Sequence, residues 1–284
     1  MSDTLRLSPM PRLEVFTMRA ALVMCAFSII SLALVPFIGA RDMGTPSTVI
    51  GILFMVSLCV LHAIATEGVK KAVGFVVAAA LITWFVEFIG CNYGWWFGEY
   101  EYTNALGPRI GNVPIMVVIS WEAIIFPSMM LVDNFLARDK PLKNSEFYLY
   151  IIIASLATGL VVTAWDFITD PVSVHLGYWR WDDGGGYMPD IDGGIPFSNF
   201  GLKGWVGAVF LISALYRVLF TDAKSVHAPR RTTTILAAAL YTSWLCNALY
   251  GCFMFGFHQV ALIGVFVMGP VVLLSWGRLF LTRT

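Results

Sequence analysis

The chain has few charged residues for its length. Only 13% of its 284 residues are Asp, Glu, Lys or Arg, whereas 58% are hydrophobic. A soluble globular domain carries about 25% charged residues, so this shortage excludes an ordinary soluble protein. The 18 basic and 18 acidic residues cancel, and a chain without excess positive charge lacks the electrostatic signature of nucleic-acid binding. We therefore expect a membrane protein with no nucleic-acid partner.

Several catalytic motifs of membrane proteins are missing. The histidines His62, His175, His227 and His258 form no H-x3-H or H-x-x-H-H cluster, which disfavours a di-iron desaturase or hydroxylase. No lysine falls inside an apolar run, so a retinal Schiff base is disfavoured. No G-x-S-x-G motif or Ser/His/Asp arrangement is apparent. These absences disfavour a di-iron centre and a retinal cofactor, and we assign no metal-binding residue.

The five cysteines form no C-x-x-C pair. Two of them, Cys91 and Cys252, would lie near the same face of the membrane, where a disulfide is conceivable. The simpler interpretation is that all five pack as small apolar side chains.

Long apolar runs dominate what is present. Each has a length close to the ~20 residues that a helix needs to cross a bilayer. The sequence predicts an all-α, polytopic transmembrane helix bundle that forms a single integral membrane domain over residues 1–284. Eight spans are expected, at roughly 17–38, 47–65, 70–89, 113–133, 147–169, 205–220, 233–253 and 260–281.

The basic residues are distributed unequally between the two sides of such a bundle. If the N-terminus is inside, fourteen of the 18 Lys and Arg residues fall on the inner side, and Arg41, Arg109, Arg180 and Lys203 fall on the outer side. Cytoplasmic loops of membrane proteins carry an excess of Lys and Arg. We therefore expect both termini to be cytoplasmic.

Two long outer connections, residues 90–112 and 171–204, differ from the short basic inner loops. Both are rich in Trp, Tyr, Gly and carboxylates. Each follows a span with an acid near its outer end, Glu87 in one case and Asp166 in the other.

Four carboxylic acids are predicted to converge in the outer half of the bundle. Asp166 and Asp170 are four residues apart and share one helix face, while Glu87 and Glu122 lie on the two preceding helices. Ionisable residues at membrane depth are costly and usually functional. Burial disfavours the charged form of a carboxylic acid, which suits a general acid that protonates an alkene. The alternative is that these acids only hydrogen-bond across helices.

Tryptophans accompany these acids. An aromatic belt at the membrane interface explains part of the set, but not Trp84 and Trp121, which fall deeper, or Trp165, which directly precedes Asp166. Aromatic faces can stabilise a carbocation where it forms. The tryptophans expected near the outer interface are Trp95, Trp96, Trp165, Trp179, Trp181 and Trp205.

Three motifs between about residues 80 and 206 resemble the integral membrane carotenoid-biosynthesis family, which includes the carotenoid 1,2-hydratases and the bisanhydrobacterioruberin hydratases. The first is Gly98-Glu-Tyr-Glu-Tyr-Thr103, followed by Val113-Pro114 and Trp121. The second is Trp165-Asp166, Asp170-Pro171 and Trp179-Arg180-Trp181. The third is Gly194-Ile195-Pro196, Asn199 and Gly204-Trp205.

The resemblance implies a cofactor-independent addition of water to a terminal isoprenoid double bond. The proton donor would be Asp166 or Asp170, with Glu87 next and Glu122 as a further candidate. A second carboxylate or Asn199 would hold the water. The residues expected to bind the substrate are Trp165, Trp179, Trp181, Tyr100, Tyr102, Trp121, Asn199 and Tyr187.

The same resemblance implies partners and a location. The substrate would be a carotenoid or a related long isoprenoid, and the other partners would be water and the lipid bilayer. Association with other carotenoid-pathway enzymes is compatible with this role. We expect a bacterial or archaeal cytoplasmic membrane, with the active-site loops on the non-cytoplasmic side.

Three alternatives remain open at this point. A membrane terpene or lycopene cyclase would use the same protonation step but quench the cation with an internal double bond. A transporter or non-catalytic carotenoid-binding protein would use the acids as a proton relay. A prenyltransferase would use Asp166 and Asp170 as a D-x3-D magnesium motif, but its diphosphate needs basic residues, and only Arg180 and Lys203 lie nearby.

Overall fold

The computed structural model describes residues 9–39, 44–137, 142–221 and 229–281. It confirms an all-α bundle with eight candidate membrane spans in the described residues, the sixth of which begins at Phe197, before the α-helix itself. The helices are α1 (Pro11–Ile38), α2 (Gly44–Glu67), α3 (Val69–Tyr93), α4 (Ile115–Leu136), α5 (Asn144–His175), α6 (Trp205–Phe220), α7 (Arg231–Phe255) and α8 (His258–Leu281).

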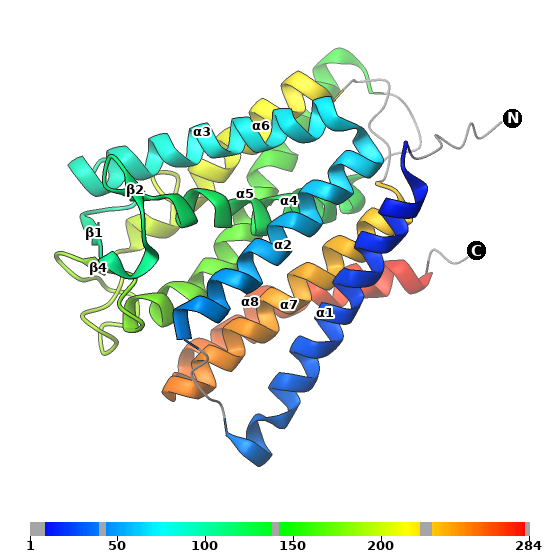
Figure 1. Ribbon diagram of the computed structural model, residues 1–284. Helices are drawn as coiled ribbons and strands as arrows, with labels where there is room; N and C mark the ends of the chain where they lie inside the picture. The colour runs from blue at the N-terminus through cyan, green and yellow to red at the C-terminus, as the bar shows by residue number, and fades with distance from the viewer. Residues whose placement is uncertain (1–8, 40–43, 138–141, 222–228, 282–284) are drawn as a thin grey trace, which may run out of the picture.

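The central helices of the bundle are α4, α5 and α7, which pack against one another and against most of their neighbours (Figure 1). In contrast, α1 and α8 expose many large apolar side chains, among them Phe27, Phe37, Phe266 and Leu273. A soluble protein rarely exposes so much contiguous apolar surface, whereas a lipid environment favours it.

The connections at one end of the bundle are structured. Strand β1 (Tyr100–Tyr102) pairs antiparallel with β4 (Trp179–Trp181), and β2 (Arg109–Ile110) pairs antiparallel with β3 (Val113–Pro114). Two short 3₁₀ helices, η1 (Asn104–Leu106) and η2 (Phe197–Phe200), complete these connections. The strands lie at the opposite end of the bundle from the start of α1 and the end of α8 (Figure 1).

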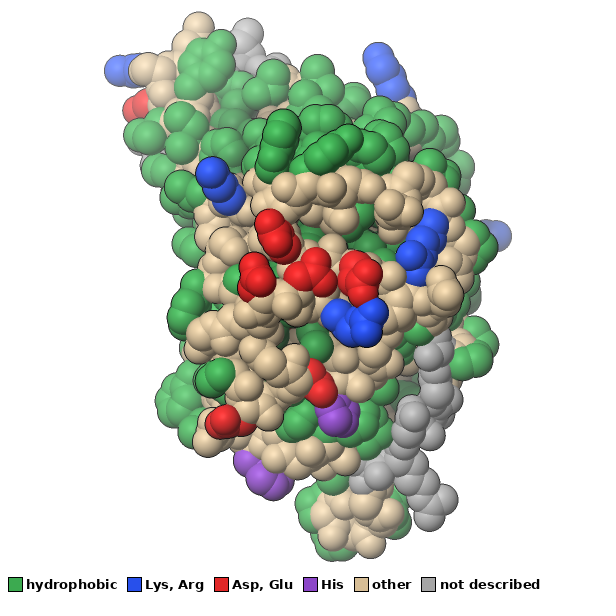
Figure 2. Space-filling view, turned by 90° about the vertical axis from the view of Figure 1, so that its left-hand side faces the viewer, with side chains coloured by type: hydrophobic (Ala, Val, Ile, Leu, Met, Phe, Trp, Pro, Cys, Tyr) green, Lys and Arg blue, Asp and Glu red, His purple; other side chains and the backbone are tan. Residues whose placement is uncertain are grey.

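Figure 2 looks onto this strand-bearing end of the molecule. Charged side chains gather at its centre and apolar side chains surround them. The pairing of β1 with β4 joins the two long connections into one cap over the helices, although the paired residues, such as Tyr102 and Trp179, are 77 or more positions apart in sequence.

Several helix boundaries differ from the prediction, and the first helix begins at Pro11 rather than near residue 17. The third helix continues past Gly90 to Tyr93, and the fifth continues past Pro171 to His175. Proline has no backbone N–H and normally leaves the carbonyl four residues earlier without its helical partner. Here the hydroxyl of Tyr187 donates to that carbonyl, on Phe167, at 2.7 Å.

The same compensation occurs inside α4. Pro127 leaves the carbonyl of Ala123 without a helical N–H, and Trp244 Nε1 of α7 donates to it at 3.0 Å. An aromatic donor from another element thus takes over the missing bond in both helices.

Polar groups buried away from the cap mostly have partners. Arg217 is 1% exposed and pairs with Asp133 at 2.6 Å, and buried charges require such partners. His62 lies between the hydroxyls of Thr17 and Thr233, at 2.8 and 3.0 Å. All five cysteines are free, so the conceivable Cys91–Cys252 disulfide is not formed.

Candidate active site

A pocket lies beneath the cap, between the helices and the β1–β4 pair. Its cavity has a volume of about 80 Å³, which is room for several water molecules. It is lined by Glu87, Phe97, Tyr100, Tyr102, Val117, Ser120, Trp121, Trp165, Asp166, Thr169, Asp170, Ser173, Trp179, Trp181, Asn199 and Trp205.

One wall of the pocket is a face of α5. Trp165, Asp166, Thr169, Asp170 and Ser173 all line the cavity, because positions three and four residues apart lie above one another on a helix. The two carboxyls are 3% and 1% exposed. The face therefore presents two buried acids, two hydroxyl side chains and one indole.

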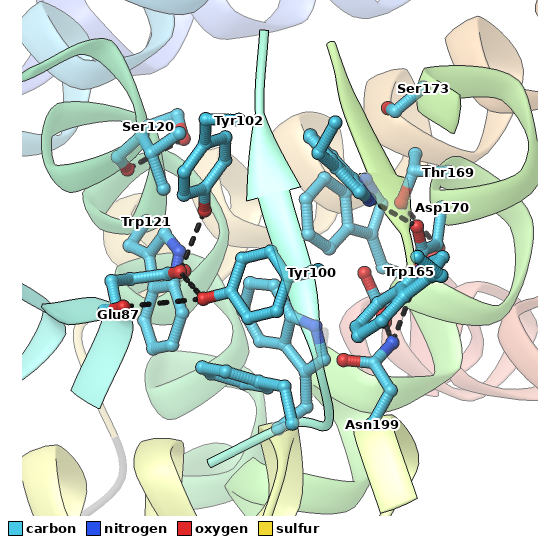
Figure 3. Close-up of a pocket in the computed structure, with 16 residues that line it drawn as sticks. Glu87, Tyr100, Tyr102, Ser120, Trp121, Trp165, Thr169, Asp170, Ser173 and Asn199 are labelled. Atoms are coloured by element: carbon cyan, nitrogen blue, oxygen red, sulfur yellow. Dashed lines mark hydrogen bonds between the residues drawn. The ribbon is translucent and has the colours of Figure 1, made fainter. Parts of the chain in front are cut away.

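Asn199 bridges the two acids. Its Nδ2 donates to Asp166 Oδ2 and to Asp170 Oδ2, each at 2.8 Å. Figure 3 shows its side-chain oxygen directed toward the Tyr100 side of the cavity. The two N–H groups of one amide are thus shared between two carboxyls.

The local fold holds Asn199 in this position. It lies in η2, which follows Pro196, and Ser198 Oγ next to it donates to the Phe97 carbonyl at 2.6 Å. A Cβ on Gly204 would lie 2.0 Å from the Asn199 carbonyl oxygen, so only glycine allows the chain to approach η2 this closely before entering α6.

The two acids have unequal surroundings. Trp179 Nε1 donates to Asp170 Oδ1 at 2.8 Å, so Asp170 accepts one hydrogen bond on each oxygen. Asp166 accepts a bond only on Oδ2, and no group in the described part of the chain donates to its Oδ1. That oxygen remains available to a molecule in the pocket.

Glu87 forms the second polar group of the pocket. Tyr100 and Tyr102 of β1 both donate to its Oε2, at 2.5 and 2.6 Å. Burial, and after it the charge of Glu87, raises the pKa of both tyrosines well above the usual range of a phenol. Both hydroxyls therefore stay protonated and act as donors. Figure 3 shows this group across the cavity from Asp170 and Asn199.

Aromatic rings form most of the remaining lining. Trp121 and Trp205 stack with centroids 4.2 Å apart, and Trp165 meets Trp205 edge to face at 5.6 Å. Phe97 packs against both Trp121 and Trp205 at 6.2 Å. The electron-rich faces of such rings attract positive charge.

The polar inventory of the pocket is acidic and neutral. None of its lining residues is a lysine or arginine. In the described ranges, no group of three or more His, Cys, Asp or Glu side chains could hold a metal ion. The pocket thus offers carboxyls, an amide, hydroxyls and aromatic faces, a set suited to proton transfer on an apolar molecule.

Ten of the twelve residues singled out from the sequence meet in this pocket. They are Glu87, Asp166, Asp170, Trp165, Trp179, Trp181, Tyr100, Tyr102, Trp121 and Asn199.

The other two residues lie elsewhere. Glu122 does not converge with the three other acids: its side chain is buried near Cys59 of α2, and neither carboxyl oxygen has a hydrogen-bond partner in the described structure. The reason is its place directly after Trp121, since neighbouring residues of a helix point about 100° apart. Tyr187 is not a lining residue either, because its hydroxyl is directed to the backbone of α5.

Sequence reasoning did not assign six lining residues to the site, and of these only Trp205 had been singled out, as a tryptophan near the outer interface. The other five are Phe97, Val117, Ser120, Thr169 and Ser173. Thr169 and Ser173 could have been found, because they follow Asp166 at helical spacing. Phe97 had no local signal, because its inward direction depends on a left-handed backbone conformation with φ of 67°.

Fold and pocket together define a class of protein. The chain is an integral membrane helix bundle with a buried acid and aromatic pocket under a capped end. Comparison with known families then gives a specific assignment: residues 47–271, from α2 to α8, match the family described as carotenoid biosynthesis protein. The chain belongs to this family.

A curated relative adds a finer comparison. The chain is 28% identical over 147 residues to the bisanhydrobacterioruberin hydratase of Haloarcula japonica. The match covers 51% of this chain and 43% of that relative, so the chain spans less than half the length of the protein it matches. No solved structure matches the chain.

Proposed function

We propose that the protein hydrates a terminal isoprenoid double bond of a carotenoid without a cofactor. The observation that carries this proposal is the pair Asp166 and Asp170, bridged by Asn199 in an aromatic pocket of a carotenoid-biosynthesis protein. The name of the Haloarcula japonica relative, a hydratase, supports the same reaction class.

Asp166 is the proposed proton donor. Its Oδ1 is free of hydrogen bonds in the described structure, whereas both Asp170 oxygens accept one. Donors stabilise a carboxylate, so the pair can share one negative charge on Asp170 and one proton on Asp166. The O–H bond of Asp166 breaks as its proton bonds to the CH carbon of the terminal double bond. The two π electrons form this new C–H bond and leave a tertiary cation at the neighbouring carbon, which carries the two methyl groups.

The cation would form among the aromatic faces of Trp165, Trp121 and Trp205. The carboxyl group of Glu87, held by Tyr100 and Tyr102 on the opposite side, adds oxygen atoms that attract positive charge. Preorganised groups aimed at developing charge usually make the largest contribution to catalysis.

Water would complete the reaction. We place it between the Asn199 side-chain oxygen and Asp170, where two acceptors can orient it. Its oxygen bonds to the cationic carbon, and its surplus proton returns to the ionised Asp166. One water molecule is consumed, the acid is restored, and the product is a tertiary alcohol.

The proposed setting is the bilayer interface. A carotenoid is about as long as a bilayer is thick, ~30 Å for the hydrocarbon core, so it can enter laterally with its reacting end under the cap. The half-buried pocket residues Ser120, Thr169, Ser173 and Trp179 mark the open side of the pocket. Water reaches the cap from the non-cytoplasmic side, and the location is a bacterial or archaeal cytoplasmic membrane.

The test is pigment analysis of a lycopene-producing bacterial host that carries the chain, compared with the same host carrying an empty vector. We expect a more polar product, heavier by one water molecule, with an unchanged chromophore. A product of unchanged mass and altered absorption would show a cyclase instead. An unchanged pigment profile in this host and in hosts that make other acyclic carotenoids would refute hydration and favour the binding or transport alternative.

A further inference from the structure

Tyr187 is buried outside the pocket but touches the helix that carries the acids. Its side chain is 8% exposed, and its hydroxyl donates to the Phe167 carbonyl at 2.7 Å. Burial raises the pKa of Tyr187, so the hydroxyl remains a donor. The carbonyl it reaches is the one that Pro171 leaves without a helical N–H.

The position of this carbonyl is significant. Phe167 directly follows Asp166, and Pro171 directly follows Asp170. The missing helical bond therefore spans the same turn that sets the spacing between the two acids. Without a substitute donor, this turn would carry an unpaired buried carbonyl and could bend at the proline.

Aromatic packing supports the same turn. The rings of Phe167 and Phe200 stack at 4.1 Å, and Tyr187 meets them edge to face at 5.3 and 5.1 Å. We call these three residues the aromatic clamp. Phe200 directly follows Asn199, so the clamp joins the backbone of the bridging amide to the backbone of the acids.

The loop that carries Tyr187 is itself fixed. The backbones of Tyr187 and Ile195 exchange two hydrogen bonds, at 3.1 and 2.8 Å. A Cβ on Gly185 would lie 1.9 Å from the Ile195 carbonyl carbon, so the two sides of the loop cross where only glycine fits. The hydroxyl of Tyr187 thus reaches α5 from a defined position.

We propose that Tyr187 is a positioning residue, which supplies the hydrogen bond that Pro171 removes and thereby holds Asp166 and Asp170 against Asn199. This rests on the proposed function for its catalytic consequence. The sequence had placed Tyr187 among the residues that touch the substrate, whereas here it acts through the helix backbone.

A double-mutant cycle tests the proposal. Tyr187→Phe keeps the ring and removes the hydroxyl, and Pro171→Ala returns a backbone N–H that can donate to the Phe167 carbonyl. We expect Tyr187→Phe to lower kcat by up to about 100-fold with little change in KM. Pro171→Ala alone should retain activity, and the double variant should recover most of the loss.

The matched control is Tyr178→Phe. Tyr178 is also buried in the same connection, at 7% exposure, and its hydroxyl has no hydrogen-bond partner in the described ranges. This variant should keep the kcat of the parent chain. If Tyr187→Phe instead raises KM, the hydroxyl acts on the substrate and the proposal is overturned. A loss of kcat that Pro171→Ala does not restore would also overturn the proposal.

Thermal unfolding of the four detergent-solubilised proteins of the cycle separates this proposal from the proposed function. The Tyr187→Phe substitution should lower the unfolding temperature in the Pro171 chain and lower it less in the Pro171→Ala chain. If Tyr187→Phe lowers the unfolding temperature equally in the two chains, the positioning role of Tyr187 is overturned, whatever the pigment assay shows. A parent chain that hydrates no carotenoid would refute the function while this unfolding comparison still decides the role of Tyr187.

Discussion

At the scale of single residues, Asp166 and Asp170 lie on the same face of α5 but accept different hydrogen bonds. Trp179 and Asn199 each donate to Asp170, while Asp166 keeps one oxygen free toward the pocket. The difference arises from β4, which brings Trp179 over Asp170 and not over Asp166. In the proposed mechanism, this difference in hydrogen bonding lets Asp166 hold a proton while Asp170 stays a carboxylate.

This difference in hydrogen bonding predicts different effects of the two amide substitutions. Asp166→Asn should reduce hydration by about 10²- to 10⁴-fold, the usual contribution of a general acid, because the amide cannot transfer a proton to the alkene. Asp170→Asn should reduce hydration less, because the proton donor Asp166 remains. Only the neighbour of Asp166 and the proposed water site change. Product formation in the pigment-producing host, normalised to the amount of protein, measures both.

The control for this pair is Asp190→Asn, which alters an exposed acid of the same connection and should leave product formation unchanged. Equal product formation by Asp166→Asn and the parent chain would remove Asp166 as the proton donor and direct attention to Glu87.

At the scale of elements, the helix α5 and the loop after it depend on each other. Tyr187 from the loop donates to the carbonyl that Pro171 leaves unpaired in the helix, and the loop keeps its shape through close glycine contacts. Gly185 and Gly194 approach so closely that a Cβ on Gly194 would lie 2.3 Å from the Gly185 carbonyl oxygen. A loop that composition alone would describe as flexible is therefore a fixed support.

This dependence predicts a large effect of a small side chain. Gly185→Ala should strongly lower both the unfolding temperature and the activity, because backbone on the facing side of the loop would have to move. Gly269→Ala is the matched control, since a Cβ there meets nothing within 4 Å and alanine favours a helix by up to about 1 kcal/mol over glycine. Thermal unfolding in detergent compares them, and equal stability of the two variants would contradict the tight crossing.

At the scale of the whole molecule, the two ends of the bundle differ in chemistry. The strand-bearing end carries the pocket, the acids and the exposed loop carboxylates (Figure 2). The opposite end, where α5 begins, carries basic residues such as Lys70, Lys71 and Lys143. Because basic loops favour the cytoplasmic side, the pocket end should face away from the cytoplasm.

Cysteine labelling in intact cells tests this orientation. In a chain with Cys91→Ser, the substitution Asp183→Cys should react with a membrane-impermeant thiol reagent, because Asp183 is exposed at the pocket end. Lys143→Cys at the opposite end should react only after the cells are permeabilised. The reverse pattern would place the pocket on the cytoplasmic side, with its water supplied from there.

The sequence by itself determined the eight apolar helices and the family of the chain. It also determined the shared face of Asp166 and Asp170, because apolar runs, motifs and helical spacing are local properties of a sequence. Only the tertiary structure decided that Glu87 joins this pair, with two tyrosines as its donors, while Glu122 lies outside the pocket. Asn199 was already a candidate from the sequence, but its bridge between the two acids, and the places of Trp205 and Tyr187, depend on how distant segments pack. The physical reason is that helix rotation and loop crossing depend on contacts between residues far apart in the chain, and no local pattern records them.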